Sequence, residues 1–227
     1  MSYLMQTYRR LPVTFVRGEG LRLYTADGRV YWDYLSGLGV NNLGHSHPII
    51  VEAIQQQATQ LIHVSNLYTI AEQERLAQEL AAVSGLDKVF FCNSGTEANE
   101  ALLKLARRYQ REIKGEDRYE VITALRSFHG RTLGALSATG QEKYHRSFQP
   151  LVPGFKYVPY NDLAAMEAAL SPQTALVLLE PVQGEGGVFP GDVAYLQGVQ
   201  ALCRQSGALF GLDEVQTGVG RTGSFYA

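Results

Sequence analysis

The sequence has few cysteines, no long apolar run and almost no net charge, and each of these features excludes a class of protein. Only two cysteines occur in 227 residues, so no disulfide framework can hold the fold, and a reducing compartment, the cytoplasm, is expected. No apolar run approaches the roughly 18 residues that cross a membrane, and the polar first ten residues predict no secretory signal. The 20 basic and 22 acidic residues nearly cancel, so binding to nucleic acid or to an anionic membrane surface is not expected.

What is present is the balance of a globular protein. Apolar residues make up 45% of the chain and charged residues 19%, and there are no repeats or low-complexity stretches. The length suits one large domain, or one domain and part of another.

The first part of the chain is irregular, with a hairpin and two helices. Short strands at Leu21–Tyr24 and Val30–Tyr34 flank Asp27-Gly28, a pair typical of hairpin turns. Proline and glycine signals predict helices over residues 48–63 and 71–83.

After this region, strands alternate with helices. The short apolar runs that predict strands are Lys88–Cys92, Glu120–Leu125, Ala175–Leu179 and Ala208–Leu212. A long amphipathic helix is predicted after Ser94-Gly95-Thr96, and another over residues 194–205. Alternation of this kind indicates an α/β fold with a largely parallel sheet, which we place at residues 50–227. Residues 1–49 are assigned to part of a second, smaller domain.

The junction at Ser94-Gly95-Thr96 is the first candidate site. A helix N-terminus offers free N–H groups, and two hydroxyls beside a glycine make a reasonable phosphate cradle. The alternative is a helix that is merely well capped, with Ser94 and Glu97 as a capping box. No Walker lysine or GxGxxG spacing is present, so neither a nucleotide P-loop nor a dinucleotide fingerprint is supported.

Three further segments leave predicted strands at the end of the sheet where ligands of parallel sheets bind. Asp213-Glu214-Val215-Gln216 places an acid there, although a helix cap or a surface ion pair would explain it too. Residues 127–132 combine an aromatic ring, an imidazole and an arginine, which could stack a ring and clamp a carboxylate or could be structural. Residues 179–187 carry carboxylates on a glycine-rich loop, whose glycines could equally serve only to turn the chain.

Metal and thiol chemistry are not favoured by the sequence. His45 and His47 have no cysteine or acid beside them, so a loop held by hydrogen bonds is preferred to a metal site. Cys92 and Cys203 lie in apolar contexts and are expected to be inert packing residues.

Taken together, five motifs in this order resemble the class III, pyridoxal-phosphate-dependent aminotransferases. They are NLGHSHP (42–48), NSGTEANEA (93–101), FHGRT (128–132), EPVQGEGGV (180–188) and DEVQTGVGRTG (213–223). The resemblance implies a fold type I large domain with a mostly parallel sheet, together with part of a small domain. It implies pyridoxal 5'-phosphate (PLP) as cofactor, a small-molecule amino donor and a 2-oxo acid as substrates, and a homodimer for the full-length enzyme.

The resemblance also implies a role for individual residues. It assigns the cofactor phosphate to Ser94, Gly95 and Thr96, and the cofactor ring to Phe128, Asp213, Val215 and Gln216. Asp213 would pair with the ring nitrogen and keep it protonated, so that the cofactor acts as an electron sink. Arg131 would bind the substrate carboxylate through its planar fork, and Glu185 would lie near the substrate side chain.

Within the family, His129, Thr96 and Arg131 favour the acetylornithine type, with 2-oxoglutarate as acceptor. Succinylornithine, ornithine, 4-aminobutyrate and lysine-pathway substrates are the alternatives, and a non-catalytic cofactor-binding fragment is another. In the family, the lysine that holds the cofactor follows the DEVQ segment by some tens of residues. None of the lysines in this chain has that context. We therefore expect the chain to be an N-terminal portion that catalyses no transamination alone.

Overall fold

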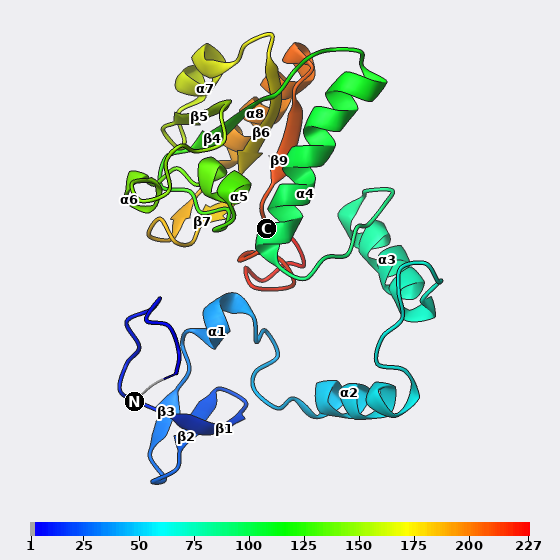
Figure 1. The fold of residues 1–227 in the computed structure, drawn as a ribbon, viewed down its shortest axis with the longest axis vertical. Coiled ribbons are helices and arrows are strands. Elements are labelled where there is room, and N and C mark those ends of the chain that lie inside the picture. Colours follow the sequence, from blue (N-terminus) through cyan, green and yellow to red (C-terminus); the bar gives the residue numbers. More distant parts are fainter. Residues whose placement is uncertain (1–2) are drawn as a thin grey trace. The chain divides into compact units, whose positions relative to one another are not determined.

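The computed structural model describes residues 3–227, and its contacts divide the chain into two units. The first unit ends at Leu76 and the second begins at Ala77, so that the division falls within helix α3 (Ala71–Ser84). Figure 1 labels the helices and strands of both units.

The first unit contains a small antiparallel sheet. Its strands are β1 (Phe15–Glu19), β2 (Arg22–Thr25) and β3 (Val30–Trp32), in that order. β2 and β3 form the predicted hairpin, in which Gly28 adopts the left-handed backbone (φ +85°) that glycine tolerates. The sheet is followed by α1 (Ser36–Gly39) and α2 (Pro48–Gln60).

His45 has a structural role in this unit. Its Nε2 lies 2.7 Å from Oδ2 of Asp33, and its backbone N–H and C=O pair with those of Gly20, between β1 and β2. This is the hydrogen-bonded loop that the sequence favoured. The described residues contain no group of three side chains placed to hold a metal ion.

The second unit is built on a parallel sheet with the order β5-β4-β6-β9. Its strands are β4 (Glu120–Ala124), β5 (Phe155–Val158), β6 (Thr174–Leu179) and β9 (Leu209–Leu212). Every residue of β6 is buried, as its continuous apolar run predicts for a strand covered on both faces.

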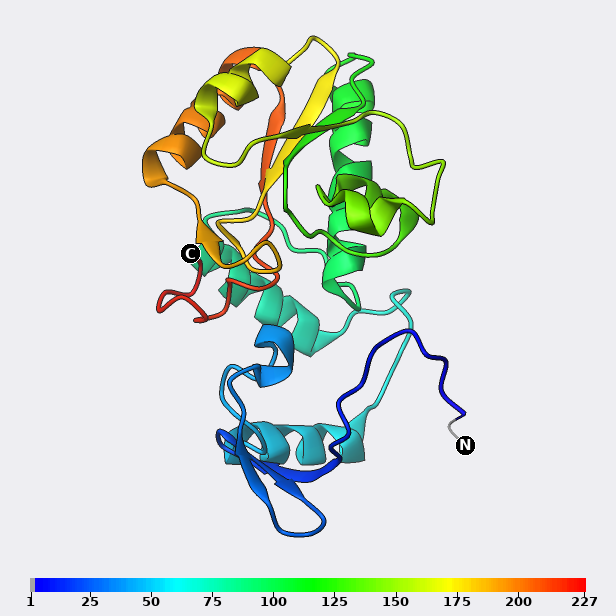
Figure 2. The same ribbon diagram turned by 90° about the vertical axis from the view of Figure 1, so that its left-hand side faces the viewer.

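Alternation along the strands divides the core into two layers. In β6, Val177 and Leu179 pack with α7 (Leu163–Ala169) and α8 (Val193–Ser206). Leu176 and Leu178 pack on the opposite face, against residues of α4 (Gly95–Arg108) and α5 (Leu133–Ala138). Figure 2 shows the yellow and orange helices on one side of the strands and the green α4 on the other.

Helix α4 begins as predicted. The Ser94 hydroxyl accepts a hydrogen bond from the Glu97 N–H at 3.1 Å, and the Glu97 carboxylate accepts one from the N–H of Asn93. The helix continues into a π-helical turn, Tyr109–Ile113, whose buried Gln110 donates to the carbonyl of Gly207 at 2.9 Å.

Two predictions for the segment before α4 are wrong. Residues 88–92 form no strand, because a strand exists only where a neighbouring strand completes its hydrogen bonds, and this segment pairs with none of the described strands. Cys92 is exposed rather than packed. Cys203 does pack in the core, where burial raises the pKa of its thiol to about 12.

Several short elements are absent from the sequence-based prediction. They are β1, α1, β5, α5, α6 (Glu142–His145), α7, β7 (Val182–Gln183) and β8 (Phe189–Pro190). Among the described residues no helix is both long and apolar enough to cross a membrane.

Candidate functional site

A pocket lies where three parallel strands end and α4 begins. Strand β6 leads directly into Glu180, β9 leads directly into Asp213, and the loop after β4 carries Phe128. The residues that line this cavity of about 190 Å³ are Ser94, Gly95, Thr96, Asn99, Phe128, His129, Gly130, Glu180, Val182, Asp213, Val215 and Gln216. Carboxyl ends of parallel strands meet at one edge of a sheet, so segments far apart in sequence converge there.

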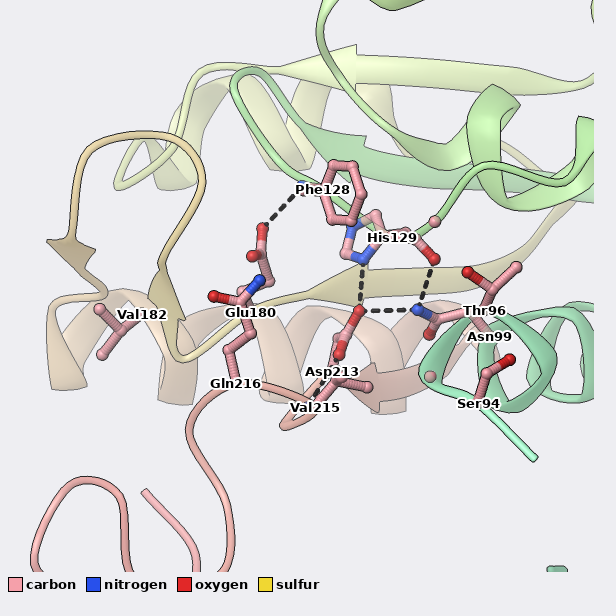
Figure 3. Close-up of a pocket in the computed structure, with 12 residues that line it drawn as sticks. Ser94, Thr96, Asn99, Phe128, His129, Glu180, Val182, Asp213, Val215 and Gln216 are labelled. Atoms are coloured by element: carbon pink, nitrogen blue, oxygen red, sulfur yellow. Dashed lines mark hydrogen bonds and ion pairs between the residues drawn. The ribbon is translucent and has the colours of Figure 1, made fainter. Parts of the chain in front are cut away.

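Asp213 is the most strongly held side chain of the pocket. Its Oδ2 accepts a hydrogen bond from Nδ2 of Asn99 and lies 2.8 Å from Nδ1 of His129. Its Oδ1 accepts a hydrogen bond from the Val215 N–H at 3.1 Å. Figure 3 shows these three side chains converging below Phe128. Only 4% of the Asp213 side chain is exposed, so the carboxylate is fixed before any ligand arrives.

The surroundings of Asp213 keep it ionised. Burial by itself would raise the pKa of this carboxyl, but the hydrogen bonds from His129 and Asn99 and the charge of His129 outweigh that effect, and the pKa is lowered.

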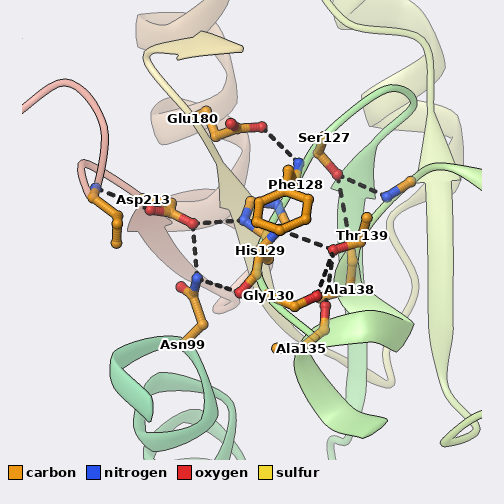
Figure 4. A network of polar contacts seen from close by, with 12 residues as sticks. Asn99, Ser127, Phe128, His129, Gly130, Ala135, Ala138, Thr139, Glu180 and Asp213 are labelled. Atoms are coloured by element: carbon orange, nitrogen blue, oxygen red, sulfur yellow. Dashed lines mark hydrogen bonds and ion pairs between the residues drawn. The ribbon is translucent and has the colours of Figure 1, made fainter. Parts of the chain in front are cut away.

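His129 and Asn99 form a network that spans two elements. Asn99 on α4 donates from Nδ2 to the backbone carbonyl of His129 at 2.8 Å as well as to Asp213. The His129 N–H donates to the hydroxyl of Thr139 at 2.9 Å, which anchors the loop after β4 to the end of α5 (Figure 4). The loop and the helix therefore hold the carboxylate from two sides.

Two glycines allow the walls of the pocket to approach closely. A Cβ on Gly95 would lie 2.6 Å from a methyl group of Val215, and a Cβ on Gly130 would collide with the Thr96 side chain. Gly130 also has φ +131°, a conformation that L side chains rarely adopt.

Glu180 is a second buried carboxyl in the same pocket. Its Oε2 accepts a hydrogen bond from the Phe128 N–H at 3.1 Å. Burial raises the pKa of Glu180 to about 8, and the nearby charges of Asp213 and Glu185 add to the shift.

The structure brings together all seven residues that the sequence assigned to the cofactor: Ser94, Gly95, Thr96, Phe128, Asp213, Val215 and Gln216. Arg131 and Glu185, assigned to the substrate, are exposed and are not among the lining residues. The Arg131 guanidinium nevertheless lies 6.0 Å from the ring centroid of Phe128.

Sequence reasoning placed His129 and Glu180 in candidate segments without giving them a role in the site, and it gave Asn99 none. Asn99 carried a readable signal, since it lies four and seven residues before Leu103 and Ala106 on the buried face of α4. A polar side chain on that face needs a partner, and Asp213 supplies it. The partners of His129 depend on long-range packing and have no comparable signal.

Comparison with known proteins gives consistent results. The family described as aminotransferase class-III matches residues 3–227. The chain is 54% identical to the acetylornithine aminotransferase of Thermosynechococcus vestitus over 98% of this chain and 56% of that protein. It is 50% identical to the enzyme of the same name from Methanocaldococcus jannaschii, over 100% of this chain and 57% of that protein. The chain therefore spans a little over half the length of these curated relatives.

A solved structure with the same arrangement is the ornithine aminotransferase of Toxoplasma gondii, which holds PLP at partial occupancy in its active site. Its TM-score is 0.94 at 35% identity, over 99% of this chain and 53% of that one. At this identity, the match supports the α/β fold described above.

Proposed function

The chain belongs to the class III aminotransferase family, and from this premise we propose that it forms the PLP-binding part of an acetylornithine aminotransferase. The reaction would move an amino group from N-acetylornithine to 2-oxoglutarate, in a cytoplasmic enzyme that acts as a homodimer. The identity of about 50% to relatives of that name supports this donor.

One observation carries the cofactor assignment. A buried carboxylate, Asp213, is held ionised by His129 and Asn99 and faces the same pocket as an aromatic ring, Phe128, and the start of α4. PLP has three features that a site must accommodate: an anionic phosphate, a flat ring, and a ring nitrogen whose protonated form is stabilised by a carboxylate. The pocket offers one partner for each.

The start of α4 suits the phosphate. The N–H groups of Gly95 and Thr96 lie in the first turn, where no intrahelical acceptor exists for them, and the helix dipole favours an anion. The hydroxyls of Ser94 and Thr96 add further donors. The pocket therefore has the polarity that a phosphate requires.

The ring and the substrate involve separate residues. Phe128 and Val215 provide apolar surface, and the Asp213 carboxylate would accept a hydrogen bond from the ring nitrogen and keep that nitrogen protonated. Bound PLP supplies an electron sink that stabilises negative charge at the substrate carbon. Arg131, beside Phe128, would bind the carboxylate of the amino donor through two parallel hydrogen bonds, and Glu185 would lie near its side chain.

A second candidate, a non-catalytic cofactor-binding module, has an observation in its favour. None of the lysines of the chain is among the residues that line the pocket. A PLP enzyme needs a lysine amine within reach of the cofactor. Ornithine, succinylornithine, 4-aminobutyrate and lysine-pathway donors remain alternatives for the substrate, and the Toxoplasma gondii relative supports ornithine.

Calorimetric titration of the full chain with PLP and with pyridoxal, which lacks the phosphate, tests the cofactor assignment. PLP is expected to bind at least about tenfold more tightly, a difference of ~1.4 kcal/mol, because only PLP reaches the start of α4. The variant Asp213→Ala should weaken both ligands and preserve their ratio. Equal affinity for the two ligands, or no binding of either, would contradict the proposal.

A further inference from the structure

Glu180 lines the pocket but is given no role by the assignments above. It directly follows β6, and only 5% of the residue is exposed. The hydroxyl of Tyr160, on the loop after β5, donates to the backbone carbonyl of Glu180 at 2.5 Å. The chain therefore leaves the strand in a fixed direction, and the carboxyl is held at the pocket wall (Figure 3).

The side chain of Glu180 is bound to the loop that carries Phe128. Its Oε2 accepts a hydrogen bond from the N–H of Phe128, on the loop after β4, at 3.1 Å. Figure 4 shows this bond above the ring of His129. The Glu180 carboxyl thus fixes the backbone of the aromatic residue of the pocket.

Burial and negative neighbours dominate the surroundings of Glu180. On the loop that carries Phe128, the imidazole of His129 faces Asp213, and the guanidinium of Arg131 lies over the Phe128 ring. The carboxylates of Asp213, after β9, and Glu185, after β7, raise the pKa of Glu180 further. Burial also raises the pKa of Tyr160, so its hydroxyl beside Glu180 stays neutral. A buried carboxyl among negative neighbours favours its protonated form.

The surroundings of the two pocket carboxyls therefore shift their pKa values in opposite directions. The pKa of Glu180 is raised to about 8, chiefly by burial, whereas the hydrogen bonds to Asp213 hold its pKa below the ordinary value. Environments that separate two carboxyls in this way assign them different tasks.

We propose that Glu180 is a positioning residue of this pocket, whose uncharged carboxyl holds the backbone of Phe128 in place and leaves Asp213 as the single carboxylate charge facing the ligand. The part of this proposal that concerns ligand affinity rests on the proposed function, because the ligand is taken to be PLP. Ionisation of Glu180 would place a second negative charge beside Asp213 and near an anionic cofactor. Affinity for PLP should then fall as Glu180 loses its proton.

Infrared difference spectroscopy of the full chain without cofactor tests the protonation state directly. The spectrum of wild type minus Glu180→Gln at pH 6.5 should contain the C=O stretch of a protonated carboxyl, and this band should disappear with a midpoint near pH 8. The matched control is Glu167→Gln on α7, an exposed glutamate whose removal should leave the band unchanged. A carboxylate signal for Glu180 at pH 6.5 overturns the proposal.

Titration with PLP between pH 6.5 and 9 tests the consequence. Wild-type affinity should fall several-fold across this range relative to Glu180→Gln, whose neutral amide keeps acceptor capacity and cannot ionise. Glu180→Ala, which lacks the tie to Phe128, should bind more weakly than Glu180→Gln at every pH. Identical pH profiles for wild type and Glu180→Gln overturn the proposal. If wild type binds no PLP at any pH, the proposed function fails, and the infrared experiment still decides the state of Glu180.

Discussion

At the scale of single residues, environment rather than residue type sets the chemistry of the pocket. Asp213 and Glu180 each directly follow a strand of the parallel sheet, and both are almost fully buried. Asp213 has donors from two side chains, Asn99 and His129, and stays ionised. The pKa of Glu180 is raised to about 8, chiefly by burial and further by the carboxylates of Asp213 and Glu185. The sequence shows that both residues are acids. The hydrogen-bond donors that give the two carboxyls different pKa values come from distant elements.

Replacing Asp213 by Asn should destabilise the fold. The amide would turn an N–H toward at least one of the donors on Asn99 and His129, leaving a buried polar group unsatisfied at a cost of about 1–3 kcal/mol. Urea unfolding followed by circular dichroism measures this difference. The control is Asp162→Asn, which caps α7 at the surface, where Asn caps equally well. Equal midpoints for the two variants would show that the Asp213 network contributes nothing to stability.

Glu180 should make stability depend on pH. The pKa of Glu180 in the folded state, about 8, lies above the ordinary value of 4.5. The stability that this difference provides is therefore fully present below pH 4.5, where the folded and unfolded states both hold the proton. Between pH 4.5 and 8 the unfolded chain releases the proton and the folded chain retains it, so stability falls by ~1.4 kcal/mol for each pKa unit of the shift.

Urea unfolding of wild type and Glu180→Gln at pH 5, 7 and 9 isolates this effect. The free energy of unfolding of wild type should decline relative to the variant from pH 5 to pH 7 and level off above pH 8. A constant difference between the two proteins across this range would mean that the folded state does not hold the Glu180 proton.

At the scale of elements, local sequence rules predict an element correctly where its own residues carry the signal. They fail where the element needs hydrogen bonds from a neighbouring segment. The sequence predicted α4 because its apolar spacing and its Ser94 cap are local signals. It predicted β6 because a continuous apolar run needs only to be covered. Residues 88–92 have the same composition as a strand, yet they form none, because no described strand lies beside them to complete their hydrogen bonds. Strand β5 was missed because its sequence, FKYV, alternates over only four residues.

The cap of α4 gives a prediction at this scale. Ser94→Ala removes the acceptor of the Glu97 N–H and should lower the free energy of unfolding by about 1 kcal/mol, while Ser94→Asp should restore most of the loss. Chemical unfolding of the three proteins measures the effect. If Ser94→Ala is as stable as wild type, the hydroxyl does not cap the helix.

At the scale of the whole molecule, the sequence indicated both the fold class and the family. Alternating strands and helices indicated the parallel sheet, and five motifs in order indicated the family. The prediction of a small domain at residues 1–49 and a large domain at 50–227 stays a prediction. The contacts divide this chain within α3, and contacts depend on packing between distant segments that local patterns do not encode.

The pocket as a whole predicts binding without turnover by this chain. Its lysines, at positions 88, 104, 114, 143 and 156, are all outside the residues that line the pocket, so no amine is placed to exchange with an amino donor. Incubation of the chain with PLP, N-acetylornithine and 2-oxoglutarate should form glutamate no faster than free PLP does. Borohydride reduction and mass spectrometry should find no single stoichiometric lysine adduct. A stoichiometric adduct on one lysine, with glutamate formed above the background, would contradict this prediction and locate the missing amine in the chain itself.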